Sequence, residues 1–112
     1  MNLKELAHMI DAQLHLGSGT GEAEIAGAYA ADTMSDLIAH AAPDTLLVTS
    51  LDNNQLLRVA ELMDVPGICI AAAGNTARRL SPGTGTALLL CRVGLEQTCA
   101  LLAAAGLKVG HA

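Results

Sequence analysis

The chain has 112 residues, a mass of 11.4 kDa and a formal net charge of -5, so it is long enough for one small domain, residues 1–112, with a single modest core. Apolar residues make up 52% of the chain and charged residues 15%, which favours a folded globule over a disordered chain. The acidic balance and the single aromatic residue, Tyr29, exclude the basic clusters and stacking rings of nucleic-acid-binding proteins, so we expect no nucleic-acid partner.

No segment of the sequence predicts export or membrane insertion. Glu5 and Asp11 interrupt what would have to be the apolar core of a secretory signal. Apolar runs such as residues 68–73 are far shorter than the ~20 residues that a membrane helix needs. We therefore expect a cytoplasmic protein with no membrane partner.

The metal-ligating residue types are scattered along the chain. Cys69, Cys91 and Cys99 are odd in number, lie among aliphatic residues and include no Cys-x-x-Cys pair, which is typical of unpaired thiols in a reducing compartment. The four histidines also have no ligand spacing. They are His8, His15, His40 and His111. We therefore expect no metal site and no cofactor.

Two helices and two short extended segments are predicted in the first part of the chain. Each helix begins with a side chain that can accept the backbone N–H three residues later, which is the spacing of a capping box. The helices cover residues 2–10 and 33–41, with the pairs Asn2 and Glu5, and Thr33 and Asp36. The extended segments are residues 12–17 and 24–31. The side chains expected to face inward from the helices are Leu3, Leu6, Met9, Ile10, Met34, Leu37, Ile38 and Ala41.

Continuous aliphatic segments alternate with amphipathic segments in the rest of the chain. The predicted strands are residues 45–51, 68–73 and 86–92. The predicted helices are residues 52–65 and 95–106, and residues 75–81 are predicted as a short helix or turn. In the first of these helices the side chains expected to face inward are Leu56, Val59, Ala60 and Met63. Gly106 is expected to end the last helix. Aliphatic strands separated by helices are typical of a parallel sheet covered on both sides. The sequence thus predicts a small α/β domain with a mostly parallel sheet and helices on both faces.

Two glycine-rich stretches raise the question of a phosphate-binding loop. Residues 16–27, "LGSGTGEAEIAG", have glycines at GxGxG spacing and no Lys-Ser/Thr ending, and a strand-like segment rather than a helix follows them. Residues 81–86, "SPGTGT", likewise precede a strand. Both stretches therefore favour turns that use the conformational freedom of glycine over a phosphate cradle.

Small polar side chains follow two of the predicted strands. Because ligands collect beyond the carboxyl ends of the strands in an open parallel sheet, these residues form a candidate site for a small anion. The candidate ligand-binding residues are Thr49, Ser50, Asn53, Gly74, Asn75 and Arg78. Helix capping by Asp52, Asn53 and Thr76 and a solvated Arg78–Arg79 pair are the alternatives. Thr49 and Ser50 are less easily explained as caps.

Residues 27–74, "GAYAADTMSDLIAHAAPDTLLVTSLDNNQLLRVAELMDVPGICIAAAG", resemble the DRTGG domain family. The order of the predicted elements matches the family along nearly the whole chain. The likeness rests on the segment "SDLIAHA", which is followed by "TLLVTS", by a helix that starts with Asn and by an apolar strand that ends in glycine. The family resembles the N-terminal domain of HPr kinase in fold. No Walker A sequence is present, so the resemblance implies a regulatory or dimerising module without catalysis of its own.

Two functions therefore remain open. The first is a non-catalytic regulatory module that senses a small anionic metabolite, such as a nucleotide, at the strand ends. The second is a structural dimerisation or docking domain for a larger enzyme or signalling partner. In either case we expect a homodimer, because a small aliphatic core is commonly supplemented by a subunit interface. The sequence holds no recognisable pairing of nucleophile and base, so we expect no enzyme activity.

Overall fold

The computed structural model describes residues 1–16, 22–51, 54–72 and 87–111. Its helices are α1 (Leu3–Met9), α2 (Met34–His40), α3 (Asn54–Leu62) and α5 (Leu95–Ala104). Its strands are β1 (Gln13–His15), β2 (Gly27–Ala30), β3 (Thr45–Thr49), β4 (Ile68–Ile70), β5 (Leu88–Leu90) and β6 (Lys108–His111). The predicted α/β class is confirmed. Residues 75–81 and the second glycine-rich stretch, 81–86, lie outside the described residues, as do residues 17–21 of the first stretch.

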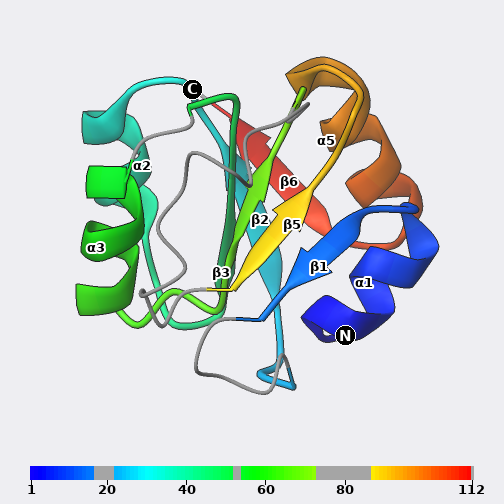
Figure 1. The fold of residues 1–112 in the computed structure, drawn as a ribbon, viewed down its shortest axis with the longest axis horizontal. Coiled ribbons are helices and arrows are strands. Elements are labelled where there is room, and N and C mark those ends of the chain that lie inside the picture. Colours follow the sequence, from blue (N-terminus) through cyan, green and yellow to red (C-terminus); the bar gives the residue numbers. More distant parts are fainter. Residues whose placement is uncertain (17–21, 52–53, 73–86, 112) are drawn as a thin grey trace.

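The strands form one sheet in the order β1-β5-β4-β3-β2-β6 (Figure 1). All neighbouring strands are parallel except β1 and β5, which are antiparallel. The chain steps in one direction from β2 through β3 and β4 to β5, and then crosses back through α5 to place β6 beside β2. The carboxyl ends of the five parallel strands consequently meet at one edge of the sheet, which we call the carboxyl edge.

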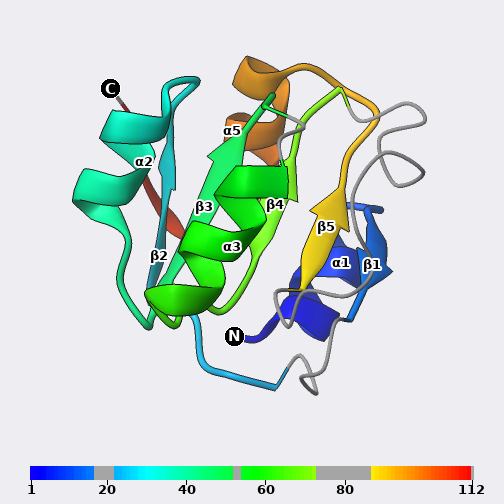
Figure 2. The same cartoon turned by 60° about the vertical axis from the view of Figure 1, so that its left-hand side comes forward.

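Helices cover both faces of the sheet, as predicted (Figure 2). Helices α2 and α3 lie on one face, and α1 and α5 lie on the other. In β3, Leu46 and Val48 pack with the α1 and α5 side, while Leu47 packs with the α2 and α3 side. Because successive side chains of a strand point to opposite faces, a strand covered on both sides must be apolar throughout. This is why the continuous aliphatic segments of the sequence become the central strands.

Both predicted N-caps are present, each with the hydrogen bond from the N–H three residues later. The Asn2 side chain accepts the N–H of Glu5 at 2.9 Å. The Thr33 hydroxyl accepts the N–H of Asp36 at 3.4 Å and donates to its carboxylate at 2.7 Å. These side chains supply partners for N–H groups that the first turn of a helix leaves unpaired, so the starts of α1 and α2 are determined locally.

Two side chains that were expected to face inward are exposed instead. Met9 is 53% exposed and Ile38 is 37% exposed, whereas Leu6 and Leu37 are fully buried. Helices α1 and α2 are only seven residues long, so each presents a narrow stripe to the sheet. In α1, Leu3, Leu6 and Ile10 fill that stripe, and Met9 lies about a quarter-turn away from it.

Strand β6 was not predicted. It follows Gly106, which ends the helical segment with a φ of 104°, as its place in the sequence suggested. Three of its four residues are exposed and Val109 is half-buried, because β6 lies at an edge of the sheet and, in the described part of the chain, pairs only with β2. Such a strand has no aliphatic run, so neither hydropathy nor alternation distinguishes it in the sequence.

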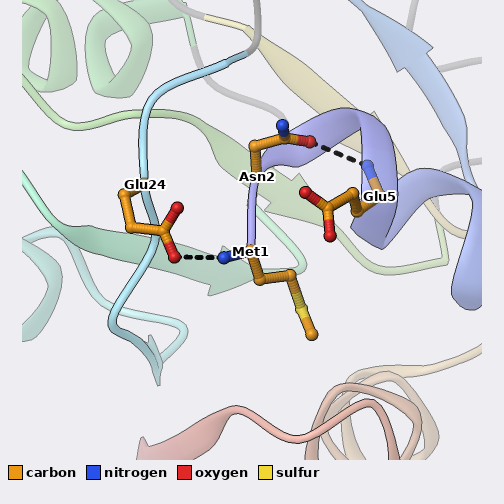
Figure 3. Close-up of polar contacts among 4 residues, drawn as sticks. All are labelled: Met1, Asn2, Glu5 and Glu24. Atoms are coloured by element: carbon orange, nitrogen blue, oxygen red, sulfur yellow. Dashed lines mark hydrogen bonds and ion pairs between the residues drawn. The ribbon is translucent and has the colours of Figure 1, made fainter.

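The first residue anchors α1 to the segment that leads into β2. The Met1 ammonium group pairs with the Glu24 carboxylate (Figure 3). The N–H of Ile25 also donates to the Met1 carbonyl, at 2.8 Å. The hydrogen bond to Glu24 raises the pKa of the ammonium group above its ordinary value. Together with the Asn2 cap, these contacts hold the start of α1 beside residues 24 and 25.

Candidate functional site

Two of the six predicted site residues lie in the described part of the chain. Thr49 is the last residue of β3 and Ser50 follows it, so both stand at the carboxyl edge, where the sequence placed them. The other four fall outside the described residues. They are Asn53, Gly74, Asn75 and Arg78.

The carboxylate of Asp32 binds the donors of both described candidates. Its Oδ1 accepts the Ser50 hydroxyl at 2.6 Å, the Ser50 backbone N–H at 2.9 Å and the Thr49 hydroxyl at 3.4 Å. Asp32 follows β2, which pairs with β3, so the carboxyl ends of these two neighbouring strands are joined. Thr49 and Ser50, which the sequence suggested as donors to an anionic ligand, thus donate to a carboxylate of the chain itself.

These hydrogen bonds keep Asp32 ionised. The Ser50 hydroxyl makes the largest contribution, followed by the Ser50 N–H, and together they hold the pKa of the Asp32 carboxyl below its ordinary value. All three donors approach Oδ1, and in the described part of the chain no donor is placed on Oδ2. Asp32 is exposed, so this second oxygen can accept a hydrogen bond from outside the chain.

Thr49 is fully buried, yet its hydroxyl has both a donor and an acceptor partner. The hydroxyl donates to Asp32 and accepts the N–H of Leu51 at 3.1 Å. A buried hydroxyl without partners would be destabilising, so the hydrogen bond to Asp32 compensates for the burial of the Thr49 hydroxyl. This hydrogen bond explains the polar side chain at position 49, which helix capping explained less easily.

Sequence reasoning missed Asp32. The residue precedes Thr33, whose capping role was evident, and an aspartate beside a helix start is commonly solvated. The sequence did contain one indication of its role. Asp32 comes directly after the predicted extended segment "GAYAA", and in a parallel sheet this segment is expected to pair with residues 45–51. Only the pairing of β2 with β3 brings the three residues together.

A groove of about 730 Å³ opens between β2, β6 and α5 at the carboxyl edge, and we call it the edge groove. Small apolar side chains form much of its lining, and Asp32, Glu96 and His111 provide its polar groups. The apolar lining residues include Ala30, Ala31, Ala100, Ala103 and Val109. Cys99 also lines it, and partial burial raises the pKa of that thiol, so the thiol is held in its protonated form.

The edge groove lies where the strand order reverses. At the carboxyl edge the chain leaves β2 for α2 on one face of the sheet, and it leaves β5 for α5 on the opposite face, which returns it to the amino end of β6 beside β2 (Figure 1). In open α/β sheets, ligands bind in the crevice that such diverging connections leave beyond the strand ends. Helix α5 begins at this groove, and its N-cap, Gly94, supplies no side chain to pair with the first N–H groups.

The described residues 1–16, 22–51, 54–72 and 87–111 contain no gathering of three side chains suited to holding a metal ion. No helix among them is both long and apolar enough to cross a membrane. Comparisons with protein-family models, curated proteins and solved structures gave no match to this chain.

Proposed function

We propose that this chain is a non-catalytic regulatory module that senses a small anionic ligand, such as a nucleotide, in the edge groove. The observation that carries this proposal is the position of a groove of about 730 Å³ where the strand order reverses. The likeness of residues 27–74 to the DRTGG family agrees with such a role and stays a prediction.

The chemistry of the edge groove suggests how a nucleotide would lie. Asp32 offers Oδ2 as an acceptor for a hydroxyl, which suits a ribose, and the small apolar side chains of β2 and α5 suit the flat face of a base. A phosphate would be repelled by Asp32 and Glu96, so we expect it to lie away from these two carboxylates. The free N–H groups of the first turn of α5 are an attractive position for it.

A thermal-shift screen of adenine and guanine nucleotides, including cyclic and dinucleoside forms, tests the proposal. At ~10 times its dissociation constant a ligand stabilises the folded chain by about 1.4 kcal/mol, which is several degrees for a domain of this size. We expect at least one nucleotide to raise the melting temperature by that amount. A screen in which none of them shifts the melting temperature contradicts the proposal.

A pair of α5 variants shows whether binding occurs in the edge groove. Ala103→Leu places a larger side chain in the lining of the groove, whereas Ala104→Leu makes the same change at the next exposed position, which is not part of the lining. We expect Ala103→Leu to abolish the nucleotide-induced shift and Ala104→Leu to retain it. Replacing Asn53 and Asn75 by Ala tests the sequence-based site separately. Loss of the shift only in those variants would place the ligand outside the edge groove.

Exposed apolar side chains favour self-association as a second candidate function. Leu62 of α3 is 84% exposed and Ile38 of α2 is 37% exposed, and the two helices lie side by side on one face of the sheet (Figure 2). Burying such side chains against a second copy of the chain would remove apolar surface from water. We therefore propose a homodimer that uses the outer surface of α2 and α3.

Light scattering at tens of micromolar chain tests this second candidate. We expect twice the chain mass of 11.4 kDa for the parent protein and a return toward the single mass for Leu62→Lys. The matched control is Gln55→Lys, which introduces the same charge at another exposed position of α3. A parent mass of 11.4 kDa would contradict the dimer, and a dimer that survives Leu62→Lys would place its interface elsewhere.

A further inference from the structure

Two buried thiols meet on the face of the sheet that α1 and α5 cover. Cys69 lies in the middle of β4 and Cys91 directly follows β5, and their Sγ atoms are 3.7 Å apart. Cys69 pairs in register with Leu89, so Cys91 is two residues further on and shares the same face. The two sulfur atoms are therefore in direct contact.

The surroundings of the two thiols differ. The contact with the Cys69 thiol contributes most to lowering the pKa of Cys91, the neighbouring Thr98 hydroxyl acts in the same direction, and burial opposes both. The hydrogen bond to Cys91 and deep burial both raise the pKa of Cys69. The thiolate is the reactive form of cysteine, so this difference favours Cys91 over Cys69 as the nucleophile of the pair.

A groove bounded by the end of α1, by β1 and by the end of β5 is lined by Cys91, which at 3% exposure is the less deeply buried of the two cysteines. This second groove has a volume of about 640 Å³, and its lining includes Cys91 together with Ile10, Asp11, Gln13 and Arg92. Cys69 is not part of the lining. A small oxidant would consequently reach Cys91 first, which agrees with its role as the nucleophile.

We propose that Cys69 and Cys91 are a redox-active pair that a hydroperoxide converts to an intramolecular disulfide. The Cys91 thiolate attacks the peroxide, the O–O bond breaks, and one oxygen leaves as water after taking a proton, which leaves Cys91 as a sulfenic acid. The Cys69 sulfur then displaces that hydroxyl as a second water. The two thiols lose two protons and two electrons, and one hydrogen peroxide becomes two water molecules.

The geometry permits this bond with a small adjustment. A disulfide requires about 2.05 Å between the sulfur atoms, so they must approach by a further ~1.7 Å. The N–H of Cys91 donates to the Ile70 carbonyl at 2.9 Å, which holds the backbone of Cys91 beside β4, so rotation of the two side chains must supply most of that approach. The third thiol, Cys99, is partly exposed on α5 and provides the competing pairings.

Peptide mapping after mild peroxide treatment tests the proposal on the parent chain. Trypsin separates the three cysteines into residues 59–78, 80–92 and 93–108, so each pairing gives a distinct linked peptide. We expect a chain lighter by two hydrogens, a link between residues 59–78 and 80–92, and a Cys99 that still reacts with iodoacetamide. Dithiothreitol should restore all three thiols. A link that includes residues 93–108, a link between chains, or unchanged thiols in a chain that remains folded by circular dichroism would overturn the proposal.

Serine variants establish the order of the steps. In Cys69→Ser the sulfenic acid on Cys91 has no partner in the pair, so we expect dimedone to label residues 80–92. In Cys91→Ser we expect Cys69 to stay unlabelled, and in Cys99→Ser we expect the disulfide to form as in the parent. Dimedone labelling of Cys69 in Cys91→Ser would contradict the assignment of the nucleophile, and the mapping of the parent chain remains decisive for the disulfide if a variant does not fold.

Discussion

Replacing Leu6 by Ala is expected to lower the free energy of unfolding by about 2–5 kcal/mol, as is usual for the truncation of a fully buried leucine. Leu6 is 0% exposed and belongs to the core cluster that joins α1 to the sheet face of Leu46 and Leu89. The change removes apolar contacts and leaves a cavity that a seven-residue helix can only partly close. Urea denaturation followed by circular dichroism measures the loss, which would be a large fraction of the stability of a small domain.

Met9→Ala is the matched control on the same helix. Met9 is 53% exposed, so its truncation is expected to change the free energy of unfolding by no more than about 0.5 kcal/mol. Both parent side chains have similar helix propensities, so the comparison isolates burial. Equal losses in the two variants would mean that α1 packs through a different face from the one described.

The helices and central strands could be predicted because their signals are local. A capping box needs only two residues three positions apart, and a strand buried on both faces needs only a run of aliphatic residues, as in residues 45–51. The inward face of a short helix was less certain: Met9 and Ile10 both fit the amphipathic pattern, and only the position of the sheet shows that Ile10 is buried and Met9 is not.

The features that could not be predicted depend on the order of the strands. Strand β6 is stable as a strand because α5 returns the chain to the free edge of β2, and nothing within "KVGH" records that return. The contact of Asp32 with Ser50 joins residues 18 positions apart and exists because β2 and β3 are neighbours. The edge groove likewise requires β2 and β6 to be adjacent, so its polar residues, Asp32, Glu96 and His111, could not be recognised together.

Asp32→Ala is expected to cost about 2–3 kcal/mol of unfolding free energy at neutral pH, because it removes an acceptor that receives three hydrogen bonds. The Thr49 hydroxyl is fully buried and would lose the acceptor of its proton, which accounts for much of the loss. The Ser50 donors are exposed and can turn to water, so their share is smaller. Asp32→Asn keeps an acceptor oxygen without the charge, and we expect a loss about half as large.

The pH dependence of these variants separates the charge of Asp32 from its shape. Hydrogen bonds hold the pKa of Asp32 below its ordinary value in the folded chain, so the unfolded chain takes up a proton first as the pH falls. The stabilisation is therefore complete above the ordinary carboxyl pKa of about 3.9 and is lost as the pH falls through the depressed pKa of the folded chain.

The difference in unfolding free energy between the parent and Asp32→Asn should be largest at neutral pH and should disappear in acid. A gap for Asp32→Asn that is the same at neutral and acid pH would show that the carboxylate at the carboxyl edge acts through packing alone.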